Sequence, residues 1–371
     1  MNVTISEEQT MLQDSVRKFV QNEVPLTRVR TLATESKGLN DELWTRLSEQ
    51  GWLGILVSEE HGGLGMGVQE LTVVAEELGR GAVPGPFLST VLVAKLISES
   101  GNDAAKARLE GLVSGLTRGA LALFEDSHEI DLSSITTKAI GSNGGLLLNG
   151  KKQLVADAQA ANLFAVAARD DDGRLVFCLV DADAPGVSIK PNKLADLTAR
   201  SANVYFKNVQ VSKDNLITQC AVDAYQKTLN VANVCIAADS IGGADYIHRL
   251  TVAYAKERTQ FGKQIGSFQA VKHPLVDMLG ELECAKSATY YAAWALDAKS
   301  PDADAAVAIA RNTATQSYRN TTNGCLQAHG GIGFTWEYDL HLFLKRAKHN
   351  QHLYGSAADY DEVICKKALG I

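Results

Sequence analysis

A helical stripe of apolar residues in the last third of the chain limits the fold more than any other feature. The stripe recurs every three or four residues, with one gap between 236 and 243, and this spacing marks one face of an α-helix. Its positions are 222, 225, 229, 232, 236, 243, 247, 250 and 254. Further long helices are predicted over 269–299 and 302–328. Because such stripes are buried against one another, we expect residues 217–371 to form a helical domain resembling a four-helix bundle.

The first part of the chain also has a helical pattern. A cap at Ser6 begins a helix with apolar residues at 12, 16 and 20, and Pro25 ends or bends it. Further helices are predicted near 40–50, 68–78 and 88–98, where glycine and proline residues separate the apolar segments. Residues 1–117 are therefore expected to form an N-terminal helical domain.

The middle of the chain has the pattern of a β domain. Short apolar runs at 120–124, 145–150, 163–167 and 175–180 are separated by turn-forming residues. Such spacing favours an antiparallel sandwich or barrel. The predicted fold class is α+β, mostly α, with domains at 1–117, 118–216 and 217–371. A parallel, doubly wound sheet would contradict this interpretation.

Charge and cysteine content argue against several classes of protein. The chain has 36 Lys and Arg and 43 Asp and Glu, a net charge of −7, and no basic block that would favour binding to nucleic acid. No apolar run reaches 18 residues and the start does not read as a signal peptide, so we expect no membrane span. The six cysteines lie far apart, without a CxxC pair. They indicate reduced thiols, no metal site and a cytoplasmic location.

Two segments at the ends of the long helices contain residues suited to binding a dinucleotide. A guanidinium can bind a pyrophosphate with two hydrogen bonds, and paired glycines let backbone N–H groups approach phosphate. Amides can bond ribose, adenine or phosphate, and phenylalanines offer apolar surface. Each motif alone also occurs as a helix cap or a turn. The residues are Arg258, Gln260, Phe261, Phe268 and Gln269 in the first segment and Gln327, Gly330 and Gly331 in the second.

The order and spacing of these residues resemble the signature of the acyl-CoA dehydrogenase family. Segments at 51–54, 62–65 and 76–79 resemble its N-terminal domain, so the resemblance covers nearly the whole chain. It implies an oxidoreductase that uses FAD to remove two hydrogens from an acyl-CoA thioester, with an electron-transfer flavoprotein as acceptor. It also implies a homo- or hetero-oligomer, a dimer or tetramer, because this family holds FAD between subunits. Residues 333–342 resemble the bacterial branch that acts on bulky or steroid-type acyl-CoAs.

The sequence departs from the family around the flavin ring and the catalytic base. The Thr-Glu-Pro segment that contacts the ring is matched by Phe-Glu-Asp at 124–126, and a Trp-Ile-Thr segment by Leu-Val-Ala at 154–156. The usual base, a glutamate, is matched by Tyr354, and a phenol is a poor base for an α-proton. A second known position for the base is matched by Ala232. The dinucleotide motif is therefore kept, whereas the residues expected at the ring and at the base are replaced.

Asp239 is the candidate catalytic base. It follows Ala232 by seven residues, about 10 Å along a helix axis, and it lies in the gap of the apolar stripe. Removal of an α-proton needs a carboxylate near the substrate α-carbon. The alternative is a structural role, in which a partly buried Asp239 pairs with a nearby arginine.

Four functions are compatible with the sequence. The first is an acyl-CoA dehydrogenase with Asp239 as a displaced base and a bulky acyl substrate. The second is a subunit of a heteromeric dehydrogenase that lends its dinucleotide-binding residues to a partner's flavin. The third is a helical interaction protein without flavin, and the fourth is a different flavin reaction on the same fold. A visible spectrum of the purified protein separates the first and fourth from the second and third.

Overall fold

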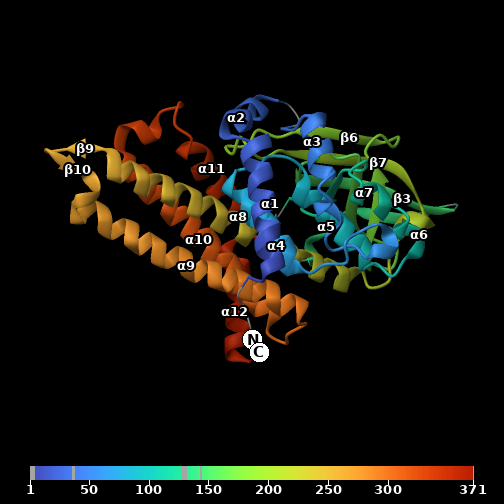
Figure 1. Cartoon of the computed structure of the whole chain (residues 1–371). Helices are drawn as coiled ribbons and strands as arrows, with labels where there is room; N and C mark the ends of the chain where they lie inside the picture. Colours follow the sequence, from blue (N-terminus) through green and yellow to red (C-terminus); the bar gives the residue numbers. More distant parts are fainter. Residues whose placement is uncertain (1–4, 36–37, 127–131, 143, 371) are drawn as a thin grey trace.

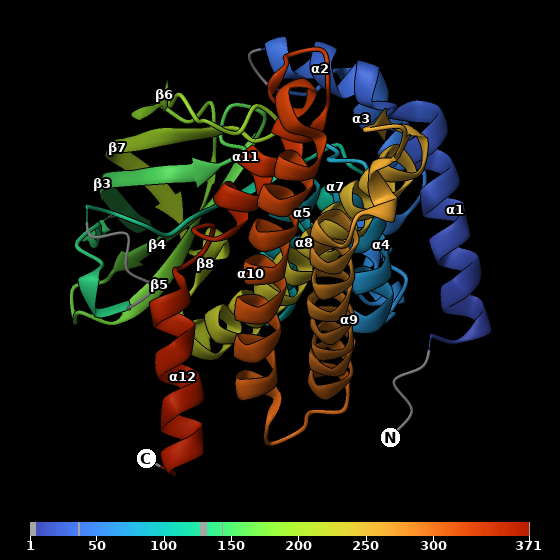
Figure 2. The same ribbon diagram turned by 90° about the vertical axis from the view of Figure 1, so that its left-hand side faces the viewer.

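The computed structural model describes residues 5–35, 38–126, 132–142 and 144–370. It has the predicted order of a helical domain, a β domain and a second helical domain (Figure 1). In the view of Figure 2 the sheet lies on one side, α1 on the other, and the long C-terminal helices between them. The middle position of the C-terminal helices places them in contact with both other domains.

The N-terminal domain begins with the predicted capped helix. The Ser6 hydroxyl accepts a hydrogen bond from the Gln9 N–H, and the Gln9 side chain accepts one from the Ser6 N–H. Pro25 separates the first two helices. The elements are α1 (Glu7–Glu23), α2 (Leu26–Thr34), α3 (Asp41–Ser48), η1 (Trp52–Gly54), η2 (Glu59–His61), α4 (Val68–Arg80), α5 (Phe87–Ser98), α6 (Asp103–Lys106) and α7 (Leu109–Val113).

The middle domain is one mostly antiparallel sheet. Its strand order is β6-β7-β3-β2-β4-β5-β8, and β1 pairs in parallel with β4, as does one residue of β2. β1 can join β4 in parallel because two strands separate them in sequence, so no tight hairpin is required. The elements are β1 (Gly119–Ala122), η3 (Leu132–Ser134), β2 (Lys138–Ser142), β3 (Gly145–Ala156), β4 (Leu163–Arg169), β5 (Leu175–Asp181), β6 (Val187–Pro191), β7 (Ser201–Ser212), η4 (Lys213–Asn215) and β8 (Leu216–Ile217).

The C-terminal domain contains the three predicted long helices, α8, α9 and α10. They pack on one another, as their apolar stripes require, and α8 also packs on α4 and α5. A small hairpin connects α8 to α9. The elements are α8 (Ala221–Glu257), β9 (Thr259–Gln260), β10 (Lys263–Gln264), η5 (Ile265–Ser267), α9 (Gln269–Asp297), α10 (Ala303–His329), η6 (Gly330–Phe334), α11 (Leu340–Asn350) and α12 (Ala357–Leu369).

Helices α4 and α8 approach each other closely and join the two helical domains. A Cβ atom at Gly79 would lie 2.3 Å from the carbonyl oxygen of Asp239. One at Gly242 would lie 1.9 Å from the carbonyl oxygen of Glu76. Only glycine permits this approach, and it fixes the backbone at Asp239 against α4.

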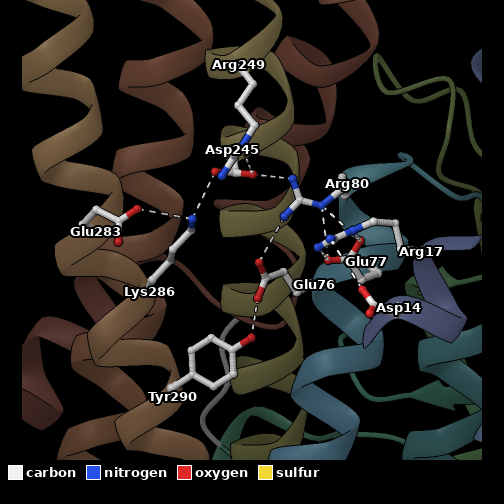
Figure 3. Close-up of polar contacts among 10 residues, drawn as sticks. All are labelled: Asp14, Arg17, Glu76, Glu77, Arg80, Asp245, Arg249, Glu283, Lys286 and Tyr290. Atoms are coloured by element: carbon white, nitrogen blue, oxygen red, sulfur yellow. Dashed lines mark hydrogen bonds and ion pairs between the residues drawn. The ribbon is translucent and has the colours of Figure 1, made fainter. Parts of the chain in front are cut away.

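A network of charged and polar side chains surrounds the α4–α8 contact (Figure 3). Arg80 of α4 forms ion pairs with Glu76 and with Asp245 of α8. Lys286 of α9 lies 3.0 Å from Asp245, and the Tyr290 hydroxyl donates a hydrogen bond to Glu76 at 2.5 Å. Burial raises the pKa of Glu76, and the Tyr290 hydrogen bond opposes that shift. Because these carboxylates are all paired, the network holds the domains together and presents no free group for chemistry.

A membrane-spanning helix and a metal-binding cluster are both absent from the part of the chain that the structure describes. No helix there is long and apolar enough to span a membrane. Among the same residues, no three His, Cys, Asp or Glu side chains are grouped so that they could hold a metal ion.

Candidate functional site

A cavity of about 100 Å³ lies where the three domains meet. Helices α4, α5, α8 and α11, the chain after β3 and the chain after α11 form its walls. Pockets that hold drug-sized ligands usually measure about 300–1,000 Å³, so this cavity in its present shape is too small for a bulky acyl group. Its polar side chains include Ser89, Asp157, Thr198, Arg200, Asp239, Arg346, His349, Asn350 and Tyr354.

Asp239 faces this cavity, but an ion pair occupies its carboxylate. Arg346 Nε lies 3.0 and 3.2 Å from the two carboxylate oxygens, and Arg346 Nη2 lies 2.5 Å from Oδ2. The Asn350 side chain donates a further hydrogen bond to Oδ1 at 2.7 Å. The Asp239 side chain is 15% exposed, which is the partial burial that the sequence predicts. The geometry favours the structural alternative for Asp239, and its role as a base stays a prediction.

Arg346 extends this ion pair to the middle domain. Its Nη1 donates a hydrogen bond to the Thr198 hydroxyl at 2.9 Å. Burial would lower the pKa of Arg346, but the adjacent Asp239 carboxylate raises it above its usual value. The Asp239–Arg346 pair therefore connects α8, α11 and the β domain across the cavity.

Tyr354 lies in the cavity wall, at the position that matches the family's glutamate. Its side chain is buried, and burial raises the pKa of the phenol. Its ring lies 6.3 Å from the Phe124 ring, with 33° between the ring planes. Phe124 itself replaces the threonine expected beside the flavin. Two aromatic side chains therefore pack together where the family has a carboxylate and a hydroxyl.

Asp157 is a second carboxylate in the cavity and is not among the site residues predicted from the sequence. It follows β3 with a left-handed backbone (φ +57°) and accepts a hydrogen bond from the Ser89 hydroxyl at 2.5 Å. Burial raises the pKa of Asp157 to about 7, against the opposing effects of the Ser89 hydrogen bond and of Arg346. The one feature of the sequence that points to Asp157 is its position directly after the 154–156 segment, which matches residues at the flavin ring. A carboxyl group that titrates near neutral pH in a cavity is a candidate for proton transfer.

The first dinucleotide segment forms a hairpin, β9–β10, at the far end of α8 and α9 (Figure 1). Arg258 follows α8, and its guanidinium is exposed, with no carboxylate partner among the described residues. Gln260 and Gln269 are also exposed. Phe261 is 91% exposed, while the partly buried Phe268 lies 4.9 Å beneath the Lys263 ammonium. An exposed, unpaired guanidinium beside exposed apolar and amide groups is suited to contact a molecule outside this chain.

The second dinucleotide segment lies at the same end of the domain. Tyr254, in the last turn of α8, stacks on His329 with ring centroids 4.3 Å apart. Gln327 is exposed in the last turn of α10, and Gly330 ends that helix with φ +62°. A Cβ atom at Gly330 or Gly331 would meet nothing within 4 Å. Packing within this chain therefore does not require glycine at 331, and open space remains beside its backbone.

These two segments fit the dinucleotide half of a bound FAD. Arg258 can bind the pyrophosphate, and the open backbone at Gly331 admits a phosphate. The residues expected around the flavin ring fit FAD less well. There the side chains of Leu154 and Ala156 replace the family's aromatic ring and hydroxyl. When bound, FAD accepts the hydride equivalent that leaves the substrate β-carbon.

Comparison with known proteins matches all three domains of the chain to the same family. Family models for the acyl-CoA dehydrogenase N-terminal, middle and C-terminal domains match residues 6–115, 120–209 and 222–366. The mitochondrial short/branched chain specific acyl-CoA dehydrogenase of Rattus norvegicus is 30% identical over 93% of this chain and 82% of its own. Among solved structures, a variant of the Tcur3481-Tcur3483 steroid ACAD is 30% identical, covers 99% of both chains and has a TM-score of 0.89. The ChsE4-ChsE5 complex from Mycobacterium tuberculosis is 25% identical, covers all of both chains and has a TM-score of 0.91.

The chain belongs to the acyl-CoA dehydrogenase family. Members of this family are FAD-dependent oxidoreductases that act on CH–CH bonds of acyl-CoA thioesters. The predicted family, fold class, type of enzyme and cofactor are thereby confirmed. The domain limits and the roles of the individual site residues stay predictions.

Proposed function

We propose that this chain is one subunit of a hetero-oligomeric acyl-CoA dehydrogenase and that it completes the FAD site of a paralogous subunit. The contrast between its two candidate sites carries the proposal. Arg258 is exposed and has no carboxylate partner among the described residues, whereas the cavity is small and has Tyr354 in its wall. The chain thus keeps the residues that would bind a neighbour's FAD, and it lacks a carboxylate at the usual position of the base and a large cavity for a substrate of its own.

The chemistry of the reaction defines what the partner must supply. Dehydrogenation would need a base at the substrate α-carbon to take its proton, and a bound flavin would supply the acceptor for the hydride equivalent from the β-carbon. This chain offers no free carboxylate at the position of Tyr354, and the Asp239 carboxylate is paired with Arg346. In this proposal the partner supplies both the base and the surroundings of the flavin ring, and this chain supplies the dinucleotide contacts.

The names of two similar structures support a bulky substrate and a heteromeric assembly. One is a steroid ACAD and the other is a complex of two different chains. We extend both features to this chain as part of the proposal, with a dimer or tetramer, an acyl-CoA of steroid-like bulk, an electron-transfer flavoprotein as acceptor and a cytoplasmic location. The long helices after Ala221 would form the contact between subunits.

Purification tests the proposal. The chain would be produced alone and together with each paralogous acyl-CoA dehydrogenase of its source organism. We expect a colourless protein alone, and a yellow, active complex with the partner that carries a glutamate at the position of Tyr354. A yellow homo-oligomer with one FAD per chain and dehydrogenase activity would contradict it.

A second candidate function is dehydrogenation at this chain's own site with Asp157 as the base. Its position in the cavity and a pKa raised to about 7 favour this alternative. The cavity would have to enlarge to admit a substrate. Asp157→Asn tests it in any active preparation. Loss of a general base lowers turnover by about 10²–10⁴-fold, whereas the heteromeric proposal predicts little change.

A further inference from the structure

The imidazole of His329 connects the two dinucleotide segments. On one face it stacks on Tyr254, with ring centroids 4.3 Å apart and 20° between the planes. It also lies beside Tyr338, at 5.0 Å between ring centroids and 50° between planes. The backbone carbonyl oxygen of Tyr254 also accepts a hydrogen bond from the backbone N–H of Arg258, at 2.9 Å. A single buried ring therefore contacts the helix end before Arg258 and directly precedes Gly330.

Hydrogen bonds fix the tautomer of this ring. His329 Nδ1 lies 2.9 Å from the Cys325 carbonyl oxygen, which can only accept, so Nδ1 carries a proton. Burial lowers the pKa of His329 and so favours the neutral ring, although the Cys325 hydrogen bond opposes that shift. Its Nε2 lone pair then accepts the Tyr338 hydroxyl proton at 3.1 Å. With both nitrogens bonded and one face stacked, the ring has a single orientation.

Charged groups lie near Tyr338, the hydroxyl partner of His329, and tie its turn to the N-terminal domain. Glu257, at the end of α8, and Asp339, beside Tyr338, are the charged residues that act on Tyr338. Asp339 is paired with Arg30 Nε of α2 at 2.6 Å, and Arg30 also bonds the Trp336 carbonyl oxygen at 2.6 Å. The turn after Gly331 is therefore held from the N-terminal domain as well as from His329.

We infer that His329 is a positioning residue that holds Arg258 and the Gly330–Gly331 turn in the relative arrangement needed to bind the FAD dinucleotide. This inference rests on the proposed function, which assigns both segments to FAD binding. His329 does not itself need to touch the cofactor. Its stacking fixes the end of α8, and its two hydrogen bonds fix the end of α10, where the left-handed Gly330 begins the turn.

Variants of His329 and Tyr338 test the inference in the FAD-containing complex of this chain with its partner. His329→Phe keeps an aromatic ring for stacking but removes both hydrogen bonds, and Tyr338→Phe removes only the bond to Nε2. One hydrogen bond corresponds to roughly a threefold to tenfold change. We therefore expect the FAD dissociation constant to rise about threefold to tenfold in Tyr338→Phe and by about the square of that factor in His329→Phe.

His248 provides a matched control. It is another buried histidine, bonded to the Leu275 carbonyl oxygen at 2.8 Å, and it lies on α8 six residues before Tyr254. His248→Phe should lower the melting temperature and leave FAD affinity unchanged within about twofold. An FAD affinity in His329→Phe no weaker than in His248→Phe would overturn the inference.

Two further measurements separate this inference from the proposed function. If Arg258→Ala weakens FAD binding and His329→Phe does not, only the positioning role fails. If neither variant weakens it, the proposed function fails as well. Nitrogen-15 NMR of histidine-labelled protein, without a partner, should show a neutral His329 with the proton on Nδ1. A proton on Nε2 would also overturn the inference.

Discussion

The outer end of the C-terminal domain and the cavity between the domains differ in how their polar groups are paired. At the outer end Arg258, Gln260 and Gln327 are exposed, and no carboxylate neutralises the guanidinium among the described residues. In the cavity the charges of Asp239 and Arg346 neutralise each other. A surface that stays unpaired is available to a ligand or partner, whereas a paired interior is complete without one. This difference is the observation on which the proposed role in a partner's FAD site rests.

Arg346→Ala should have the largest effect of the variants proposed here. It should lower the free energy of unfolding and leave FAD affinity unchanged. The change leaves Asp239 partly buried without its cation, and removal of one partner from a buried ion pair costs about 3–5 kcal/mol. Urea denaturation of the purified chain measures the loss. A loss below about 1 kcal/mol would mean that the Asp239–Arg346 pair does not hold the elements around the cavity together.

Arg258→Ala should have the opposite pattern. The side chain is exposed in the free chain, so the free energy of unfolding should change by less than about 0.5 kcal/mol. FAD binding to the assembled enzyme should weaken by about 2–5 kcal/mol, the cost of removing one partner from a hydrogen-bonded charge pair. Equilibrium dialysis of FAD measures this, with Lys256→Ala as an exposed cationic control shortly before the motif. Equal affinities in both variants would remove Arg258 from the FAD site.

Asp239→Asn separates the structural role of Asp239 from the catalytic one. The amide is nearly isosteric but loses the charge facing Arg346, and a hydrogen bond to a charged group is worth about 1.5–3 kcal/mol. We expect a lower melting temperature, unchanged FAD binding and little change in turnover of the complete assembly. A fall in turnover of about 10²–10⁴-fold without a change in melting temperature would instead identify Asp239 as the base.

The pH dependence of stability should show the state of Asp157. Because the folded-state pKa, about 7, lies above the ordinary value of 3.8, the neutral form stabilises the fold. This contribution is complete below about pH 4 and is lost as the pH rises through 7. The melting temperature of the parent protein should therefore decline between pH 5 and 8 more than that of Asp157→Asn. Parallel curves for the two proteins would show that the folded-state pKa of Asp157 does not lie near 7.

The sequence was sufficient to predict the fold because the fold depends on periodic patterns. The stripe from 222 to 254 predicts α8, and the short apolar runs predict four of the strands. Strand β7 was missed because its alternation of buried and exposed residues is interrupted near Lys207 and Asn208. Each of these patterns involves residues that are close together in the chain, so it can be recognised from this sequence alone.

The pairing inside the cavity could not be predicted in the same way. Asp239 and Arg346 are 107 residues apart, and no local spacing links them. Asp157 comes from the β domain, whereas the two positions that match the family's base, Ala232 and Tyr354, lie in the C-terminal domain. The dinucleotide residues are easier to propose from sequence, because each segment is continuous, and their role stays a prediction. Which of the two sites is open depends on side-chain packing between distant elements.

The FAD content of the hetero-oligomer tests the central claim most directly. The complex would be purified, its FAD released and measured by absorbance, and each chain quantified by amino-acid analysis. One FAD for each pair of different chains is the predicted result, because in the proposed function this chain completes a partner's site and its own cavity is too small for a bulky substrate. Two FAD molecules for each pair would show that this chain also holds a flavin of its own, and would contradict the account.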